Sequence, residues 1–477
     1  MSLKKIAAIL LFAFCAFFAV FAQAAPIPLR GVVEGFYGKP WSQEERVDMM
    51  AFCGAHGLNA YIYAPKDDPY HREKWREPYP ESQRKKLAKL IRAAQKHDVR
   101  FIYALSPGLD ASYALIHGAM DREKLLAKLD SVYTLGVRDF AVFFDDITEK
   151  DGAGQAELLR WLDEHFVKAH GDVSPLITVP TEYYLADMRE ANGRAKQYTK
   201  DFSRGLPSDA TPLFTGDGVA RSGLSEKSLD EAAALYGRRL GLWWNYPVND
   251  YMEDKLALGP VENLPKTGAV PAVFFNPMAA AEMSKIALAT GADYALAPES
   301  YEPQAAWEKA IREQYGELAP QMEVFADHSQ HLENHWANIG RQDGSALRVE
   351  MDEFWRVWPA GENADICLAN LREKTDTLKN AAKTLQGRLP GKQRRECKYQ
   401  LKRLEHLAEA DGLALDLLEA LKAGDDKRAK KLKKKLEKKI RKITDGKEKA
   451  KISETVCLAF LEEALRFVGD ETKKSCP

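Results

Sequence analysis

The 477-residue sequence lacks an excess of charge of either sign, since 69 lysines and arginines stand against 70 aspartates and glutamates. With no net field to attract a polyanion, no nucleic acid partner is expected. Beyond residue 24 no apolar run is long enough to span a membrane, so we expect no permanent membrane insertion of the mature chain. No glycine-rich phosphate loop follows the first apolar run either, which argues against a nucleotide-binding fold.

The one long apolar run lies at the start of the chain. Two lysines precede an apolar core that ends at Phe21, and the small residues 22–24 follow. This is the build of a secretory signal, and we predict that residues 1–24 are a signal peptide cleaved before Ala25. A membrane anchor is the alternative, because the core nearly reaches spanning length, but the small residues favour cleavage. We therefore expect a bacterial protein that is periplasmic or secreted.

Cysteine is scarce, with six residues in the whole chain. Export would place those beyond the signal in an oxidising space, where one or two disulfides in the C-terminal part are expected. Cys53, inside "VDMMAFCGAHGL", is predicted to be a buried free thiol on a helix. Spacing leaves the pairing open among Cys367, Cys397, Cys457 and Cys476.

Short apolar runs alternate with longer amphipathic stretches over residues 27–300. Such runs, separated by helical segments, are typical of parallel strands covered by helices. Eight units predict an α/β domain of the TIM (β/α)₈ barrel type, with a doubly wound open sheet as the alternative. The runs are "LRGVVEGF", "NAYIYAP", "VRFIYALSP", "FAVFFDD", "LITVPTE", "PLFTG", "GLWWN" and "AVFFNP".

The pattern changes in the C-terminal part. Proline and glycine become sparse after about residue 318, and stretches such as "EHLAEADGLALDLLEALKAG" keep apolar residues at helical spacing. We predict a separate all-α helical bundle over residues 301–477. A chain of this length is also more than one hydrophobic core usually serves.

Polar residues follow each apolar run. In a barrel all eight strand ends open on one face, so these groups are expected to converge at one mouth. Turn formation explains any single cluster, but Lys and Tyr are not typical turn formers. The groups are Glu34-Gly35, Lys66-Asp67-Asp68, Ser106, Asp145-Asp146, Thr181-Glu182-Tyr183, Thr215 with Asp217, Asn245 and Asn276.

Asp145 and Asp146 stand side by side at the end of a buried run. Alone, the dipeptide is typical of a turn or a helix cap. At a barrel mouth, two adjacent carboxylates cannot both ionise freely, which suits general acid chemistry. Neighbouring residues point different ways from a strand end, which fits neither spacing of the usual glycosidase carboxylate pairs. The arrangement fits a reaction in which the substrate supplies the nucleophile.

Seven blocks, in order over about residues 29–300, resemble the β-N-acetylglucosaminidases of glycoside hydrolase family 84, which include O-GlcNAcases and enzymes called hyaluronidases. The resemblance implies a retaining exo-β-N-acetylglucosaminidase that removes terminal N-acetylglucosamine from a glycan or glycoprotein through an oxazoline intermediate, with no cofactor and no metal. The blocks are "GVVEGFYGKPW", "YIYAPKDDPYHREKWRE", "FIYALSPGLD", "FFDDI", "PTEYY", "NDYMEDKLALGP" and "FFNP".

The resemblance also implies roles for individual residues. Asp145 would hold the N–H of the sugar's 2-acetamido group, and Asp146 would protonate the leaving oxygen and then activate water. Gly35 and Lys66, with Asp250 and Asn276, would contact sugar hydroxyls; Tyr183 would contact the acetamido oxygen, Asn245 would support the catalytic pair, and Trp243 and Thr215 would line the site.

Each of these residues also has a plain structural interpretation when taken alone. Lys66 and Asp250 could form a surface ion pair or a cap, Tyr183 and Trp243 could fill the barrel, and Gly35 could form a turn. Trp244 occupies a position that is acidic in some relatives, which bears on aglycone preference.

Two further stretches, one with three histidines and one rich in lysine, could bind a ligand. His328, His331 and His335 have the spacing of one helix face, which fits a polar helical surface better than a metal site. Residues 427–442 carry eleven basic residues and one acid, with apolar residues at helical spacing. We predict an amphipathic bundle helix there, with contact to an anionic polymer as the functional alternative.

Two other functions remain open from the sequence. A glycan-binding protein that does not hydrolyse would keep the pocket, although the intact pair of aspartates argues against it. An endo-acting hyaluronidase would share the chemistry and differ in the size of its products.

Overall fold

A computed structural model describes residues 25–112, 115–361, 363–445 and 450–474. The predicted signal peptide, residues 1–24, lies outside this range. Within it, no helix is both long and apolar enough to cross a membrane.

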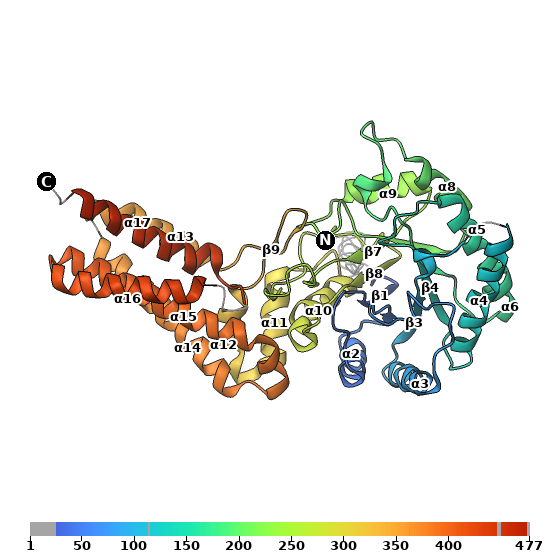
Figure 1. The fold of residues 1–477 in the computed structure, drawn as a ribbon, viewed down its shortest axis with the longest axis horizontal. Coiled ribbons are helices and arrows are strands. Elements are labelled where there is room, and N and C mark those ends of the chain that lie inside the picture. Colours follow the sequence, from blue (N-terminus) through green and yellow to red (C-terminus); the bar gives the residue numbers. More distant parts are fainter. Residues whose placement is uncertain (1–24, 113–114, 362, 446–449, 475–477) are drawn as a thin grey trace, which may run out of the picture.

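Eight parallel strands close into a barrel, which confirms the predicted fold class (Figure 1). Closure is made by the first and last strands, where Leu29 pairs with Ala272 and Val32 with Phe275. An open sheet is therefore excluded. The strands are β1 (Leu29–Glu34), β2 (Ala60–Tyr63), β3 (Arg100–Leu105), β4 (Asp139–Phe143), β5 (Ile177–Val179), β6 (Thr211–Phe214), β7 (Gly241–Trp244) and β8 (Ala272–Phe275). Each predicted apolar run overlaps one of these strands, and β4 and β6 each start one residue before their run.

The barrel interior is a packed core and not a channel. Because side chains alternate along a strand, every second residue points inward. Val33, Ile62, Ala104, Phe143 and Phe274 belong to this inner cluster and are buried. The filled interior forms a floor beneath the carboxyl ends of the strands.

Helices surround the barrel on the outside. The first of them begins at Ser42, whose hydroxyl accepts the backbone N–H of Glu45 while the Glu45 carboxylate accepts that of Ser42, which completes a capping box. The elements are α2 (Gln43–Ala55), α3 (Glu81–Lys96), η1 (Pro107–Leu109), α4 (Leu115–Tyr133), α5 (Gly152–Leu162), η2 (Asp163–Val167), α6 (Lys168–His170), α7 (Leu185–Met188), α8 (Gln197–Gly205), α9 (Glu226–Tyr236) and α10 (Ala281–Leu296).

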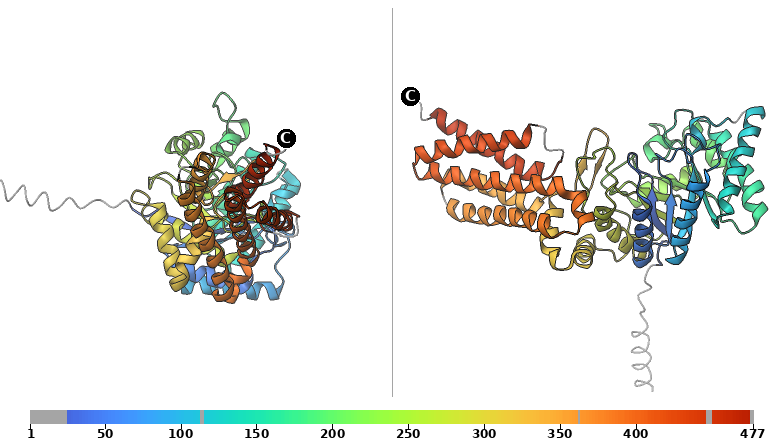
Figure 2. Two further views of the ribbon diagram at one scale, coloured as in Figure 1. Left: turned by 90° about the vertical axis from the view of Figure 1, so that its left-hand side faces the viewer. Right: turned by 60° about the horizontal axis from the view of Figure 1, so that its bottom comes forward.

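The C-terminal region is helical, as predicted, and extends to one side of the barrel (Figures 1 and 2). Long helices pack side by side through apolar faces, with Leu404, Leu415 and Phe460 fully buried. The boundary at residue 300 falls between α10 and the next helix and stays a prediction. The elements are α11 (Pro303–Tyr315), η3 (Gly316–Leu318), α12 (Ala319–Asp327), β9 (Leu332–Glu333), β10 (Asn338–Ile339), α13 (Ser345–Val357), η4 (Trp358–Ala360), α14 (Ala364–Arg388), α15 (Gly391–Lys422), α16 (Asp426–Thr444), η5 (Glu454–Leu458) and α17 (Ala459–Lys474).

The lysine-rich stretch forms α16, an amphipathic helix, as predicted. Ala429, Leu436 and Ile443 are buried at a spacing of seven residues. Most of the basic side chains lie on the exposed face. Burial of the apolar stripe against α15 accounts for the helix without a ligand.

The prediction of a helical face carrying three histidines is wrong. Helix α12 ends at Asp327, and His328 and His331 lie beyond it. The Asp343 carboxylate accepts the backbone N–H groups of Gln330 and His331, which diverts the chain from a helical path. His328 instead bonds through Nδ1 to Ser453, at 2.8 Å.

Cys53 is a buried free thiol on α2, as predicted. Cys367, Cys397 and Cys457 are also free, so the expectation of disulfides is wrong for these three, and Cys476 lies outside the described residues. They lie on α14, on α15 and in η5, where they pack with the apolar core of the bundle. There they act as small apolar side chains.

Glu396 of α15 joins the bundle to the barrel by accepting the backbone N–H of Met283 at the start of α10, at 3.0 Å. Burial raises the pKa of Glu396 to about 7, with Glu282 and Glu45 adding to the rise against the effect of the Met283 N–H. The folded protein therefore binds this proton more tightly than the unfolded chain. Its contribution to the free energy of unfolding falls as the pH rises from about 4.5 to 7.

Replacing Glu396 by Gln should reduce this pH dependence, because the amide keeps an acceptor for the Met283 N–H but does not ionise. The expected result is a smaller fall in melting temperature between pH 5 and pH 8 than in the wild type, measured by calorimetry. If the melting temperature of the variant falls as much as that of the wild type, Glu396 is not the group that causes the pH dependence.

Candidate active site

A cavity of about 400 Å³ opens at the carboxyl ends of the barrel strands. All ten residues singled out from the sequence line it: Gly35, Lys66, Asp145, Asp146, Tyr183, Thr215, Trp243, Asn245, Asp250 and Asn276. They come from loops that follow β1, β2 and β4–β8, and from Trp243 within β7. Barrel closure thus brings residues that are up to 241 positions apart in sequence (35 to 276) into one pocket.

Other polar residues at strand ends do not reach the pocket. Glu34 points outward, where its carboxylate pairs with Arg46 at 2.7 Å and accepts the hydroxyl of Tyr61. Asp68 accepts the hydroxyls of Tyr63 and Tyr79. The expectation that all strand-end groups converge is wrong for these residues. Successive side chains of a strand face opposite sides, which turns Glu34 away from the inward-facing Val33. Asp68 lies in the loop beyond β2, where the two tyrosine hydroxyls hold it.

Asp145 is held by a buried ion pair with Lys66, whose ammonium donates to Oδ2. Burial acts to raise the pKa of Asp145, but the charge and the hydrogen bond of Lys66, together with the charge of Arg72, outweigh burial, so that the pKa lies below the usual range of an aspartate. The other carboxylate oxygen, Oδ1, is buried and has no protein partner among the described residues. Asp145 is therefore an ionised acceptor with one oxygen free.

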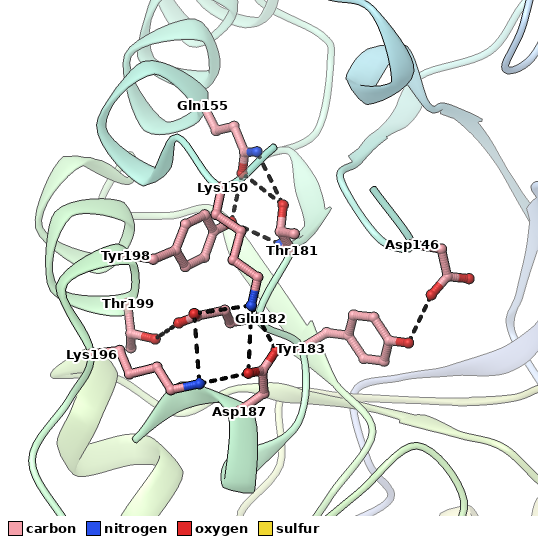
Figure 3. A network of polar contacts seen from close by, with 10 residues as sticks. All are labelled: Asp146, Lys150, Gln155, Thr181, Glu182, Tyr183, Asp187, Lys196, Tyr198 and Thr199. Atoms are coloured by element: carbon pink, nitrogen blue, oxygen red, sulfur yellow. Dashed lines mark hydrogen bonds and ion pairs between the residues drawn. The ribbon is translucent and has the colours of Figure 1, made fainter. Parts of the chain in front are cut away.

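Asp146 turns the opposite way and lies at the mouth of the pocket. Its Oδ2 accepts the hydroxyl of Tyr37 at 2.8 Å. Its Oδ1 accepts the hydroxyl of Tyr183, also at 2.8 Å (Figure 3). The backbone φ of Asp146 is +55°, in the left-handed region. That conformation costs about 1–2 kcal/mol for most residues, and aspartate and asparagine tolerate it best. The strained turn separates the two adjacent carboxylates.

Arg72 supports this arrangement from the loop after β2. It donates to the Tyr37 hydroxyl at 2.8 Å and to the backbone carbonyl of Asp146 at 3.2 Å. The same loop is anchored by His71, whose Nδ1 lies 2.7 Å from the carbonyl of Ala104. Burial, and then the charge of Lys66, lowers the pKa of His71 to about 4, so the imidazole is neutral.

The floor of the pocket is built around Trp243. Its indole N–H donates to Oδ1 of Asn245 at 2.8 Å, and the same oxygen accepts the amide of Asn276 at 3.0 Å. Asn245 in turn donates to the carbonyl of Val219. The resemblance gave Asn245 the role of supporting the catalytic pair, and in the structure its bonds go to the floor instead. The oxygen of Asn276 is buried and without a protein partner among the described residues.

Two more predicted residues shape the walls. Asp250 accepts the backbone N–H of Tyr37 at 2.8 Å, and burial raises the pKa of its carboxyl. Thr215 donates to the carbonyl of Gly218 at 2.8 Å. Asp250 thereby fixes the segment that places Tyr37 beside Asp146.

Sequence reasoning missed several lining residues. Tyr37 lies inside the quoted block "GFYGKPW" but was given no role. Trp336 comes from the segment after the barrel and packs on Tyr251, with ring centroids 4.6 Å apart. Arg221 holds it by donating to the Trp336 carbonyl at 2.6 Å. No periodicity in the sequence points from Trp336 to the pocket.

Trp244 is not one of the lining residues. It alternates with Trp243 on β7 and is buried between the barrel and the outer elements. An effect of Trp244 on aglycone preference by direct contact is therefore not supported by the structure.

Comparison with known families identifies two regions. A family model described as beta-N-acetylglucosaminidase matches residues 30–327, and one described as hyaluronidase post-catalytic domain-like matches residues 346–461. The protein O-GlcNAcase of Mus musculus is 33% identical over 272 residues, which cover 55% of this chain and 29% of that protein. For the Rattus norvegicus protein O-GlcNAcase the identity is 32%, with the same coverage. This chain thus matches under a third of the length of these relatives.

Solved structures match over both regions. CpGH84B has a TM-score of 0.88 and 37% identity, covering 92% of this chain and 77% of that chain. The Thermobaculum terrenum O-GlcNAc hydrolase, solved as an aspartate-to-asparagine mutant, has a TM-score of 0.83 and 27% identity, covering 92% and 94%. The similarity therefore extends from the barrel into the helical region.

The close packing of Gly35 against the Trp243 ring can be tested by substitution. An ideal Cβ at this position would lie 2.3 Å from Cζ2 of Trp243, whose ring is buried against Phe143. Replacing Gly35 by Ala should displace the indole and lower kcat/KM by roughly 10²-fold, since a shift of about 1 Å has that effect. Gly387→Ala is the control, because nothing lies within 4 Å of its added Cβ. Full activity of Gly35→Ala would contradict the tight floor.

Proposed function

Because the chain belongs to the β-N-acetylglucosaminidases of glycoside hydrolase family 84, we propose that it is a retaining exo-β-N-acetylglucosaminidase, acting on terminal β-linked N-acetylglucosamine of a glycan or glycoprotein. The observation that carries the proposal is the buried Oδ1 of Asp145, which has no partner in the described part of the chain, in a pocket where Lys66 favours the ionised carboxylate. Such an oxygen needs a donor, and the N–H of a 2-acetamido group is one.

In the first step, the acetamido carbonyl oxygen of the substrate attacks the anomeric carbon. Asp145 accepts the acetamido N–H and stabilises the positive charge that develops on the resulting oxazolinium ring. The bond to the leaving oxygen breaks as Asp146 gives that oxygen its proton. The geometry supports this division of labour, because one carboxylate is buried beside a cation and the other lies at the mouth.

In the second step, Asp146, now a carboxylate, takes a proton from water. The water attacks the anomeric carbon from the side that the leaving group vacated and opens the oxazoline ring. Two displacements at the same carbon give net retention. The two adjacent aspartates therefore have separate tasks, which explains why their side chains diverge.

Exo action is supported by the shape of the site. The packed barrel interior closes the pocket below. Asn276 lies near this floor, and its buried oxygen, for which the described ranges offer no partner, is an acceptor for a sugar hydroxyl. Trp336 and Tyr251 add an apolar wall. Endo action is the alternative, and sizing the products released from a hyaluronan polymer distinguishes the two.

Asp146→Asn keeps the left-handed backbone and an acceptor oxygen for one of the two tyrosine hydroxyls, but it removes the proton donor. For a glycoside with a poor leaving group, kcat should fall about 10²–10⁴-fold, and an activated aryl glycoside should lose much less, because its leaving group needs no proton. Steady-state kinetics on both substrates check this. Equal losses on the two would count against the acid role. Asp67→Asn, on an exposed loop residue, is the matched control.

Asp145→Asn should reduce turnover of both glycosides to a similar degree, because both react through the same assisted displacement by the acetamido oxygen, whatever their leaving group. A thiazoline analogue of the oxazoline should inhibit the wild type and bind the variant far more weakly, as measured by calorimetry. Tight sugar binding without turnover by the wild type would favour a glycan-binding protein instead.

Two properties outside the pocket remain proposals. Export to the periplasm or the medium is supported by the signal-like residues 1–24, and an intact N-terminus in the protein purified from its natural host would contradict it.

Contact of residues 427–442 with an anionic polymer is supported by the exposed basic face of α16. The test replaces these lysines with neutral residues and measures retention of the protein on a column that carries anionic groups. Unchanged retention would rule out the contact with an anionic polymer.

A further inference from the structure

Asp146 and Tyr183 lie on two different loops that are linked twice. Inside the pocket, the Tyr183 hydroxyl donates to Asp146 at 2.8 Å. Outside it, Lys150, in the loop that follows β4 and carries Asp146, pairs with Glu182 at 3.3 Å in the loop that follows β5 and carries Tyr183 (Figure 3). Neither Lys150 nor Glu182 is among the residues that line the pocket.

Glu182 is a buried charge, with 4% of its side chain exposed. A buried carboxylate is costly unless it is paired and hydrogen-bonded. Thr199 donates to it at 2.9 Å, and Lys196 lies 3.9 Å away. Asp187 closes the cluster, at 3.2 Å from Lys150 and 2.7 Å from Lys196.

The charges of this cluster stabilise one another. Burial acts to lower the pKa of Lys150, but hydrogen bonding to Asp187 and the charges of Asp187 and Glu182 raise it above its ordinary value. Lys150 is therefore a cation that bridges two carboxylates. The cluster joins the loops after β4 and β5 and the N-terminal side of α8.

The Tyr183 loop is also fixed just before the tyrosine. The backbone N–H of Thr181 donates to the Tyr198 hydroxyl at 2.7 Å, and that hydroxyl donates to Gln155 at 2.6 Å. The Gln155 amide returns a bond to the Thr181 hydroxyl at 3.1 Å. Thr181 is thus tied to α5 and α8, which leaves the backbone before Tyr183 little freedom (Figure 3).

We propose that Lys150 and Glu182 are positioning residues whose ion pair sets the separation of the Asp146 and Tyr183 loops and so aims the Asp146 carboxyl at the leaving oxygen. The inference rests on the proposed function for the acid role of Asp146. Asp146 has a strained backbone, with φ of +55°, so its orientation depends on its surroundings. The pair supplies a constraint from outside the pocket that the substrate does not disturb.

The test compares Lys150→Met with the wild type on two β-N-acetylglucosaminides, one with an activated aryl leaving group and one with a poor leaving group. Misplacing the acid should lower kcat/KM for the poor leaving group by about 10–10²-fold and leave the activated substrate within about threefold. A general loss of folded protein would lower both equally. Lys150→Arg, which keeps the ion pair, should restore the wild-type ratio.

Lys196→Met is the matched control. It removes a lysine from the same cluster, at the side of α8, without cutting the link between the two loops. Its ratio of activities on the two substrates should match the wild type. If Lys196→Met changes the ratio as much as Lys150→Met does, the link between the loops is not the cause and the proposal is wrong.

Glu182→Gln covers the case in which Lys150→Met does not fold, as judged by circular dichroism. The amide retains an acceptor for Thr199 and loses the charge pair, so the same change in ratio is expected. A wild type that turns over neither glycoside overturns the proposed function, and the positioning role falls with it. An active wild type whose ratio is unchanged in Lys150→Met and Glu182→Gln overturns the positioning role alone.

Discussion

The ion pair between Lys66 and Asp145 is the interaction on which the pocket depends. A carboxylate in a largely apolar cavity would otherwise take up a proton, because burial disfavours its charge. The charge and the hydrogen bond of the adjacent ammonium, with the charge of Arg72, reverse that preference, and the ammonium occupies only one of the two oxygens. The remaining oxygen is a fixed acceptor, ready before any ligand arrives, so little reorganisation is needed when positive charge develops nearby.

The backbone conformation at Asp146 lets the two adjacent aspartates point in different directions. Two carboxylates in consecutive positions would repel each other if both faced the cavity floor. The left-handed turn sends Asp146 to the mouth, where Tyr37 and Tyr183 each donate to it, while Asp145 stays with Lys66. The strain of this turn is offset by contacts on both sides, which is a common property of functional sites.

The helical region takes part in the site although it lies outside the barrel. Trp336 belongs to the segment between α12 and α13, and a buried ion pair of Lys255 with Asp343, at 2.6 Å, ties that segment to the loop between β7 and β8. Closed barrels with open mouths leave the walls of their pockets to the connecting segments. Here one wall is supplied from beyond the last strand.

From the sequence alone, eight apolar runs predicted the parallel barrel, because the period of a strand is a local and regular property. The resemblance to a family then singled out ten residues that all line one pocket. Only the tertiary structure decided what those residues contact. Asn245 bonds to the floor, Glu34 faces outward and Trp336 comes from another region. Cys367, Cys397 and Cys457 are free thiols. These outcomes depend on packing between distant segments, which no sequence period encodes.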